Sequence, residues 1–177
     1  MLTTPAPVFD ARSLLPPRQF ADVVATVQGN NPGMDPATAG RIVTEALAFV
    51  AIAAANPTTV IAPSRVVDEG WHALILHTAV YGRLCDRLGT FIHHYPEPPD
   101  PTRHDDEVMD RTIGLLHAAG HEPDMDVWAA PSNGRIIVTE AGVHTPKPGD
   151  CSPIEIIRPQ KPQPAPPQKT AAAAVRR

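Results

Sequence analysis

Residues 35–56 have the sequence DPATAGRIVTEALAFVAIAAAN, and this stretch decides the fold. Asp35 is a good N-cap, and Pro36 suits the first helical position, where its missing N–H costs nothing. The C-terminal half of the stretch is apolar on nearly every face, which is typical of a helix buried at the centre of a protein. Asn56 precedes Pro57 and should leave the helix. The stretch therefore predicts one central core helix.

Three other segments show helical periodicity around this core. They are Pro17–Gln28 before it, and then about Arg65–Leu88 and about Thr102–Ala119 after it. Only one short stretch, GRIIVTEAGV at residues 134–143, alternates well enough to predict a strand or hairpin arm. We therefore expect an all-α fold, a compact bundle of about four main helices with a short β element.

The chain divides into three parts by composition. Residues 1–16 form a flexible lead, residues 17–144 the helical domain, and residues 145–177 a proline-rich tail that includes RPQKPQPAPPQK. Proline at this density prevents a packed core, so the tail is predicted to be disordered. Its PxxP spacing is used by proteins that bind aromatic grooves, and the tail is therefore a candidate segment for a protein partner.

Whole-chain composition excludes several classes of protein. A formal charge of −4 argues against a nucleic-acid-binding surface, which needs a concentrated excess of Lys and Arg. Two cysteines give no disulfide framework, and the N-terminus lacks the pattern of a signal peptide. The longest apolar run, Ala46–Ala55, is about half the length that a bilayer needs. The sequence predicts a soluble, cytoplasmic protein that binds neither nucleic acid nor membrane.

Chemically active side chains are concentrated in Val67–Pro96, VDEGWHALILHTAVYGRLCDRLGTFIHHYP. Asp68 and His72 are one helical turn apart, so a carboxylate and an imidazole can share one metal ion. The return after the helix can add His93 or His94 as a third ligand, and Cys85 is a candidate fourth. Nitrogen and oxygen donors suit zinc or ferrous iron, and a thiolate would favour zinc.

Other interpretations of the same histidines and cysteine stay open. Asp68 can instead accept a hydrogen bond from His72 in a buried polar cluster that holds no metal. Cys85 lies on the apolar face, where a thiol is usually inert packing, although a nucleophilic thiol with a His partner is a further alternative. His77 points away from His72 on a regular helix and should lie outside the cluster. His117 and His121 are predicted to lie on the surface at a helix C-terminus.

The stretch resembles the core motif of the glycine-rich domain-containing protein-like family, in a short form without the glycine-rich extension. The resemblance covers about Pro63 to Trp128, and Leu74 and His77 depart from its pattern. The resemblance implies a fold and no biochemical activity. It does not imply a site that would need the family's own residues at positions 74 and 77. The matching residues are Asp68, Trp71, His72, Ile75, Leu76, Thr78, Tyr81, Cys85, His93, His94 and Pro96.

Two functions follow from these patterns. One is a small metalloprotein that uses the Asp/His cluster, with or without catalysis. The other is a non-catalytic interaction module that combines the helical bundle with the proline-rich tail. The sequence specifies no reaction and no substrate.

Overall fold

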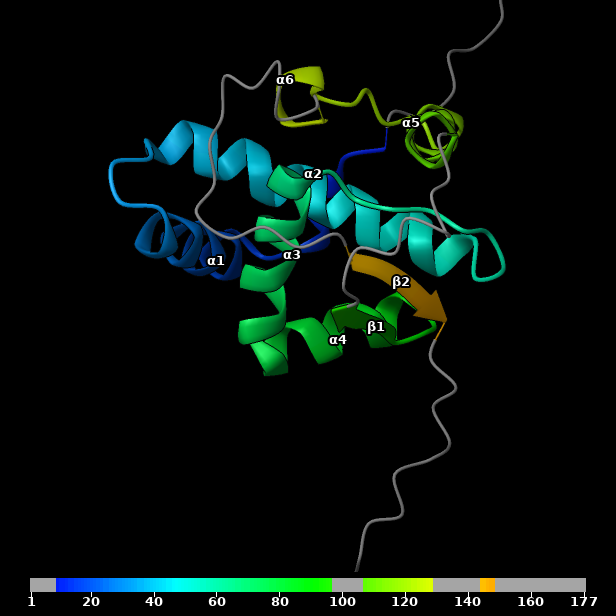
Figure 1. Cartoon of the computed structure of the whole chain (residues 1–177). Coiled ribbons are helices and arrows are strands. Elements are labelled where there is room, and N and C mark those ends of the chain that lie inside the picture. The colour runs from blue at the N-terminus through cyan, green and yellow to red at the C-terminus, as the bar shows by residue number, and fades with distance from the viewer. Residues whose placement is uncertain (1–8, 97–106, 129–143, 149–177) are drawn as a thin grey trace, which may run out of the picture.

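The computed structural model describes residues 9–96, 107–128 and 144–148, and these residues form a mainly helical protein (Figure 1). Helices make up most of the described chain, and of its two short strands the first lies between two helices and the second follows the last helix. The elements are a 3₁₀ helix η1 (Ala11–Leu14), α1 (Pro17–Asn30), α2 (Pro36–Ala55), α3 (Arg65–Leu76), α4 (Thr78–Leu88), β1 (Ile92–Pro96), α5 (Val108–Ala118), α6 (Met125–Trp128) and β2 (His144–Pro148). The predicted all-α class is confirmed.

Helix α2 is the core of the bundle, with α1 and α3 packed along it (Figure 1). Asp35 accepts a hydrogen bond from the backbone N–H of Thr38 at 2.9 Å, so the predicted cap is present. Among the described helices, α2 alone is long and apolar enough to cross a bilayer, but 61% of its most apolar window is buried in the protein. Its apolar surface is therefore used for packing, as in a soluble protein.

Helix α3 crosses α2 at very short range because residue 70 is glycine. A Cβ atom placed on Gly70 would lie 2.8 Å from the backbone oxygen of Ile42 and 2.9 Å from the Cβ atom of Ala46. Ser64 fixes the start of α3, since its hydroxyl accepts from the N–H of Val67 at 3.1 Å. Contact with α2 and the cap together set the position of α3.

The predicted helix over about Arg65–Leu88 is wrong in one respect, because the chain breaks at His77 into α3 and α4. His77 has a non-helical backbone (φ −84°, ψ 60°), and its Nε2 atom lies 2.8 Å from the hydroxyl of Thr26 on α1. The break brings the indole N–H of Trp71 within hydrogen-bonding distance of the Tyr81 hydroxyl, at 2.9 Å. In a straight helix ten residues span about 15 Å along the axis, so this bond requires the change of direction.

Strands β1 and β2 form an antiparallel pair, in which His94 lies opposite Pro146. The sequence indicated only a return of the chain after the helix in the segment that contains β1, and the strand pairing was not predicted. The strand predicted at residues 134–143 lies outside the described residues, as do residues 102–106 of the fourth predicted helix. Strand β2 begins at His144 and runs into the predicted tail, and residues 149–177 of that tail are also outside the described part.

The N-terminal segment also differs from the expected flexible lead. Residues 9–16 contain η1, and Ala11 and Leu15 are buried in the hydrophobic core.

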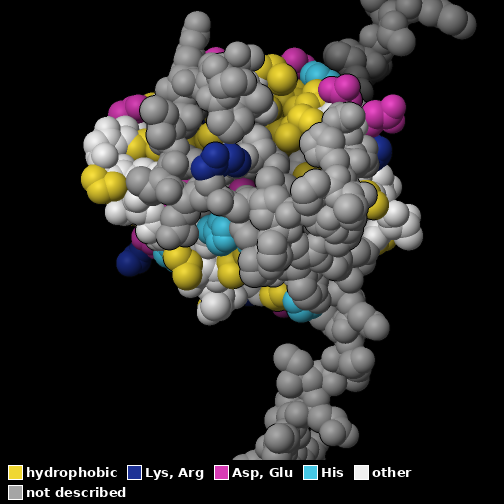
Figure 2. All heavy atoms as spheres, in the orientation of Figure 1, with side chains coloured by type: hydrophobic (Ala, Val, Ile, Leu, Met, Phe, Trp, Pro, Cys, Tyr) yellow, Lys and Arg dark blue, Asp and Glu magenta, His cyan; other side chains and the backbone are white. Residues whose placement is uncertain are grey.

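On the face of the molecule in Figure 2, the Lys and Arg side chains of the described residues are dispersed, and histidine lies at the surface among hydrophobic side chains.

Candidate metal centre

Helix α3 presents a carboxylate and an imidazole on one edge of its buried face. Asp68 is in the first turn, where the positive end of the helix dipole favours a carboxylate, and it is only 3% exposed. His72 follows one turn later, and its Nδ1 atom lies 3.3 Å from Oδ2 of Asp68. The side chain of His72 is 35% exposed, so this end of the cluster faces solvent.

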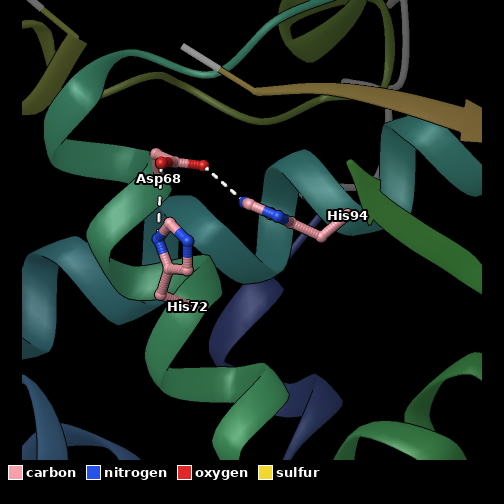
Figure 3. Close-up of side chains that lie close together, drawn as sticks. All are labelled: Asp68, His72 and His94. Carbon is pink, nitrogen blue, oxygen red and sulfur yellow. Dashed lines mark hydrogen bonds and ion pairs between the residues drawn. The ribbon is translucent and has the colours of Figure 1, made fainter. Parts of the chain in front are cut away.

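Strand β1 supplies the third side chain of the cluster. His94 points from β1 toward Asp68, and its Nε2 atom lies 3.1 Å from Oδ1 of that carboxylate (Figure 3). Its side chain is 8% exposed. One potential ligand atom from each of Asp68, His72 and His94 lies within 4.8 Å of the other two. We call these three residues the three-ligand cluster.

The two other candidate ligands are not in the cluster. His93 precedes His94 on a strand, where successive side chains point to opposite faces. Its ring lies 4.7 Å from that of Phe91. Cys85 is 1% exposed and lies beside the hydroxyl of Tyr81 on α4. The structure therefore brings together three of the five predicted ligands, and His77, which contacts Thr26, lies elsewhere as expected.

Aromatic packing holds the imidazole of His94 in place. The ring of Trp71 meets it edge-on, with the ring centroids 4.5 Å apart, and the ring of His72 lies 4.3 Å from it. Trp71 is fully buried. The carboxylate of Asp68 lies between the buried imidazole of His94 and the partly exposed imidazole of His72, where it can bind a metal ion or accept a hydrogen bond from each ring.

The donor set suits a divalent transition metal. Two imidazole nitrogens and one carboxylate oxygen are the ligands of many zinc and non-haem ferrous centres. In a tetrahedral site with metal–ligand bonds near 2.0–2.1 Å, neighbouring ligand atoms are roughly 3.3 Å apart. The oxygen–nitrogen distances of 3.3 Å from His72 and 3.1 Å from His94 are close to this spacing, and they run to different oxygens of Asp68, Oδ2 and Oδ1. The same distances also fit hydrogen bonds from each imidazole to Asp68.

A second buried cluster was not predicted from the sequence. Glu45 on α2 is 3% exposed, and His121 lies with its Nε2 atom 3.1 and 3.0 Å from the two carboxylate oxygens. Trp128 donates from its indole N–H to the same carboxylate at 2.7 Å. The prediction of a surface position for His121 is wrong, since it is 8% exposed. The signal was available: Glu45 is the one acidic residue within an otherwise apolar run.

This second cluster fastens the segment after α5 onto the core helix. The hydrogen bond to Glu45 raises the pKa of His121, although burial acts in the opposite direction. Nearby, Arg41 donates to Asp124 at 2.8 Å and to Asp126 at 3.1 Å, and this contact lowers the pKa of Asp124. A cavity of about 760 Å³ lies alongside. Four charged groups on its wall form two pairs, Arg41 with Asp124 and Glu45 with His121, which indicates a structural role.

The three-ligand cluster lies within a region of the chain that matches a known protein family. A model of the UCP032817-like family matches residues 15–113. The chain belongs to the UCP032817-like family. The resemblance to the glycine-rich domain-containing protein-like family is therefore wrong. It rested on short motif matches from Pro63 onward, whereas the family match also covers α1 and α2. No curated protein and no solved structure matches the chain.

The matched region, residues 15–113, contains all three cluster residues and does not include Trp128 or the C-terminal part of the chain. The description of the UCP032817-like family assigns no activity.

Proposed function

We propose that this UCP032817-like protein binds a divalent transition-metal ion, zinc or ferrous iron, through Asp68, His72 and His94. The observation that supports the proposal is one buried carboxylate with two imidazole nitrogens at 3.1 and 3.3 Å. A carboxylate that is 3% exposed needs partners, because burying an unpaired charge is costly. A bound cation would satisfy this carboxylate and leave both imidazoles neutral, as metal ligation requires.

Three protein ligands leave at least one coordination position for water or for another molecule. This arrangement is typical of catalytic rather than structural zinc sites, which are closed by four protein ligands. The 35% exposure of the His72 side chain supports an open side of the centre that faces solvent. We infer a metal centre in a soluble, cytoplasmic protein, with an accessible position on the metal.

Metal titration of protein freed of any affinity tag tests the proposal. Zinc binding is measured by calorimetry, and cobalt(II) substitution is followed by its visible absorption spectrum. We expect one ion per chain in the wild type, and loss of binding by at least 100-fold in Asp68→Asn and His94→Ala, since each removes a ligand.

His93→Ala is the matched control. It removes an imidazole from the neighbouring position of the same strand, and it should leave the affinity unchanged because His93 lies on the other face. Equal losses in His93→Ala and His94→Ala would point to nonspecific binding by surface histidines. A wild-type protein that binds no ion with an affinity better than about 1 mM would show that the three residues form only a hydrogen-bonded polar cluster.

A further inference from the structure

The hydroxyl of Tyr81 joins the two elements that carry the three-ligand cluster. It accepts a hydrogen bond from the indole N–H of Trp71 on α3 at 2.9 Å. It donates its own proton to the backbone oxygen of Ile92, the first residue of β1, at 2.6 Å. Tyr81 is 2% exposed. A phenol has one proton to donate, so this proton is committed to β1.

Both partners of Tyr81 are close to metal ligands in the chain. Trp71 directly precedes His72, and its ring contacts His94 at 4.5 Å. Ile92 is two residues before His94, and residues at this spacing face the same side of a strand. The low exposure of both side chains, 2% for Ile92 and 8% for His94, agrees with a shared inward face.

We infer that Tyr81 is the positioning residue of the metal centre: its hydroxyl sets β1 against α3 so that His94 reaches Asp68. This inference rests on the proposed function. Tyr81 acts through the indole of Trp71 on one side and through the backbone of Ile92 on the other. Two ligands, Asp68 and His72, are already set by a single helix, so the placement of β1 is what completes the donor set.

The hydroxyl is suited to this role at all physiological pH values. Burial raises the pKa of Tyr81, and its neighbour Cys85 acts in the same direction. The phenol therefore stays protonated and continues to donate to Ile92. Without the hydroxyl, the backbone oxygen of Ile92 and the indole N–H of Trp71 would both lose a partner in a buried region, and β1 would be free to shift.

Tyr81→Phe tests the inference, because it removes the hydroxyl and keeps the ring. Groups that hydrogen-bond a metal ligand directly contribute about 10–100-fold to metal affinity. Tyr81 acts one residue further away, so we expect zinc affinity to fall by about tenfold, the lower end of this range. Thr112→Val is the matched control. Thr112 is fully buried on α5, accepts from Ala62 N–H at 3.2 Å and donates to Val108 at 2.7 Å. This control loses a buried hydroxyl of similar connectivity and should keep wild-type zinc affinity.

A second readout needs no metal. In the metal-free protein, the ring of Trp71 should shift the NMR resonance of the His94 Hε1 proton, and Tyr81→Phe should move that resonance toward its position in an unstructured peptide. If the wild type bound no zinc, the proposed function would fail, and this resonance would still decide whether Tyr81 positions His94. Unchanged affinity together with an unchanged His94 resonance in Tyr81→Phe would overturn the inference.

Folding of the variant is checked by circular dichroism. Should Tyr81→Phe not fold, the wild type provides the test through the indole N–H resonance of Trp71 during a zinc titration. The inference expects this resonance to shift in step with metal occupancy, because the indole N–H donates to the Tyr81 hydroxyl, which in turn binds the strand that carries His94. An indole resonance that stays fixed up to full occupancy would contradict it.

Discussion

Gly70→Ala should destabilise the protein, although alanine is a better helix former than glycine. The added Cβ would lie 2.8 Å from the backbone oxygen of Ile42 and 2.9 Å from both Ala46 Cβ and the Cγ2 atom of Ile42. Ordinary contacts begin at about 3.4 Å, so α3 and α2 must separate by roughly 0.5 Å. Overpacking of this kind costs about 1–3 kcal/mol, against a gain of about 1 kcal/mol in helix propensity.

Gly82→Ala on α4 isolates the packing effect. A Cβ at Gly82 meets nothing within 4 Å, so this variant should be stabilised by about 0.5–1 kcal/mol. Chemical denaturation measures both free energies of unfolding, and the two variants should differ by about 1–3 kcal/mol, the cost of overpacking alone. Equal stabilisation of both variants would show that α3 does not lie against α2 at the distance described. Gly70 lies between Asp68 and His72 in the chain, so the proposed metal centre predicts that Gly70→Ala also weakens zinc binding and that Gly82→Ala does not.

Three further predictions concern the buried charges. Zinc at 100 times its dissociation constant should stabilise the wild type by about 2.7 kcal/mol, raising the melting temperature by several degrees, and a chelator should reverse the shift. The pKa of His121 is raised in the folded protein. The stability that its pair with Glu45 contributes is therefore complete below about pH 6.5 and is lost as the pH rises through the folded pKa. His121→Gln should remove this pH dependence from the melting temperature. Glu69 is 3% exposed and accepts from Asn31 at 3.0 Å, so Asn31→Ala should cost about 1–3 kcal/mol in urea unfolding, and a loss below 0.5 kcal/mol would contradict this account.

Helix ends were predictable from the sequence because their causes are local. Asp35 and Ser64 accept from backbone N–H groups three residues ahead, and Gly89 takes the left-handed conformation (φ 82°) that ends α4. The break at His77 had no such local signal. It depends on Thr26, which is 51 residues away, and on the bond between Trp71 and Tyr81.

The candidate site could be predicted in part for the same reason. Asp68 and His72 are neighbours through helical periodicity alone. The choice between His93 and His94 depended on which face of β1 is buried, and the strand itself pairs with β2, more than 40 residues later. Cys85 was a candidate only while the direction of α4 was unknown. Membership of the UCP032817-like family rests on residues across 15–113, which is more information than one motif provides.

Glu45 has a consequence for how a newly made chain is sorted. It lies at the middle of α2, the helix that is apolar and long enough to be inserted into a bilayer. An acidic residue at the centre of an inserted helix costs about 2.5–3.5 kcal/mol on insertion scales such as those measured for Asp, whereas each Leu or Val gains only about 0.3–0.6 kcal/mol. The carboxylate that His121 and Trp128 bind in the folded protein therefore makes α2 a poor substrate for the insertion machinery before those partners have been synthesised.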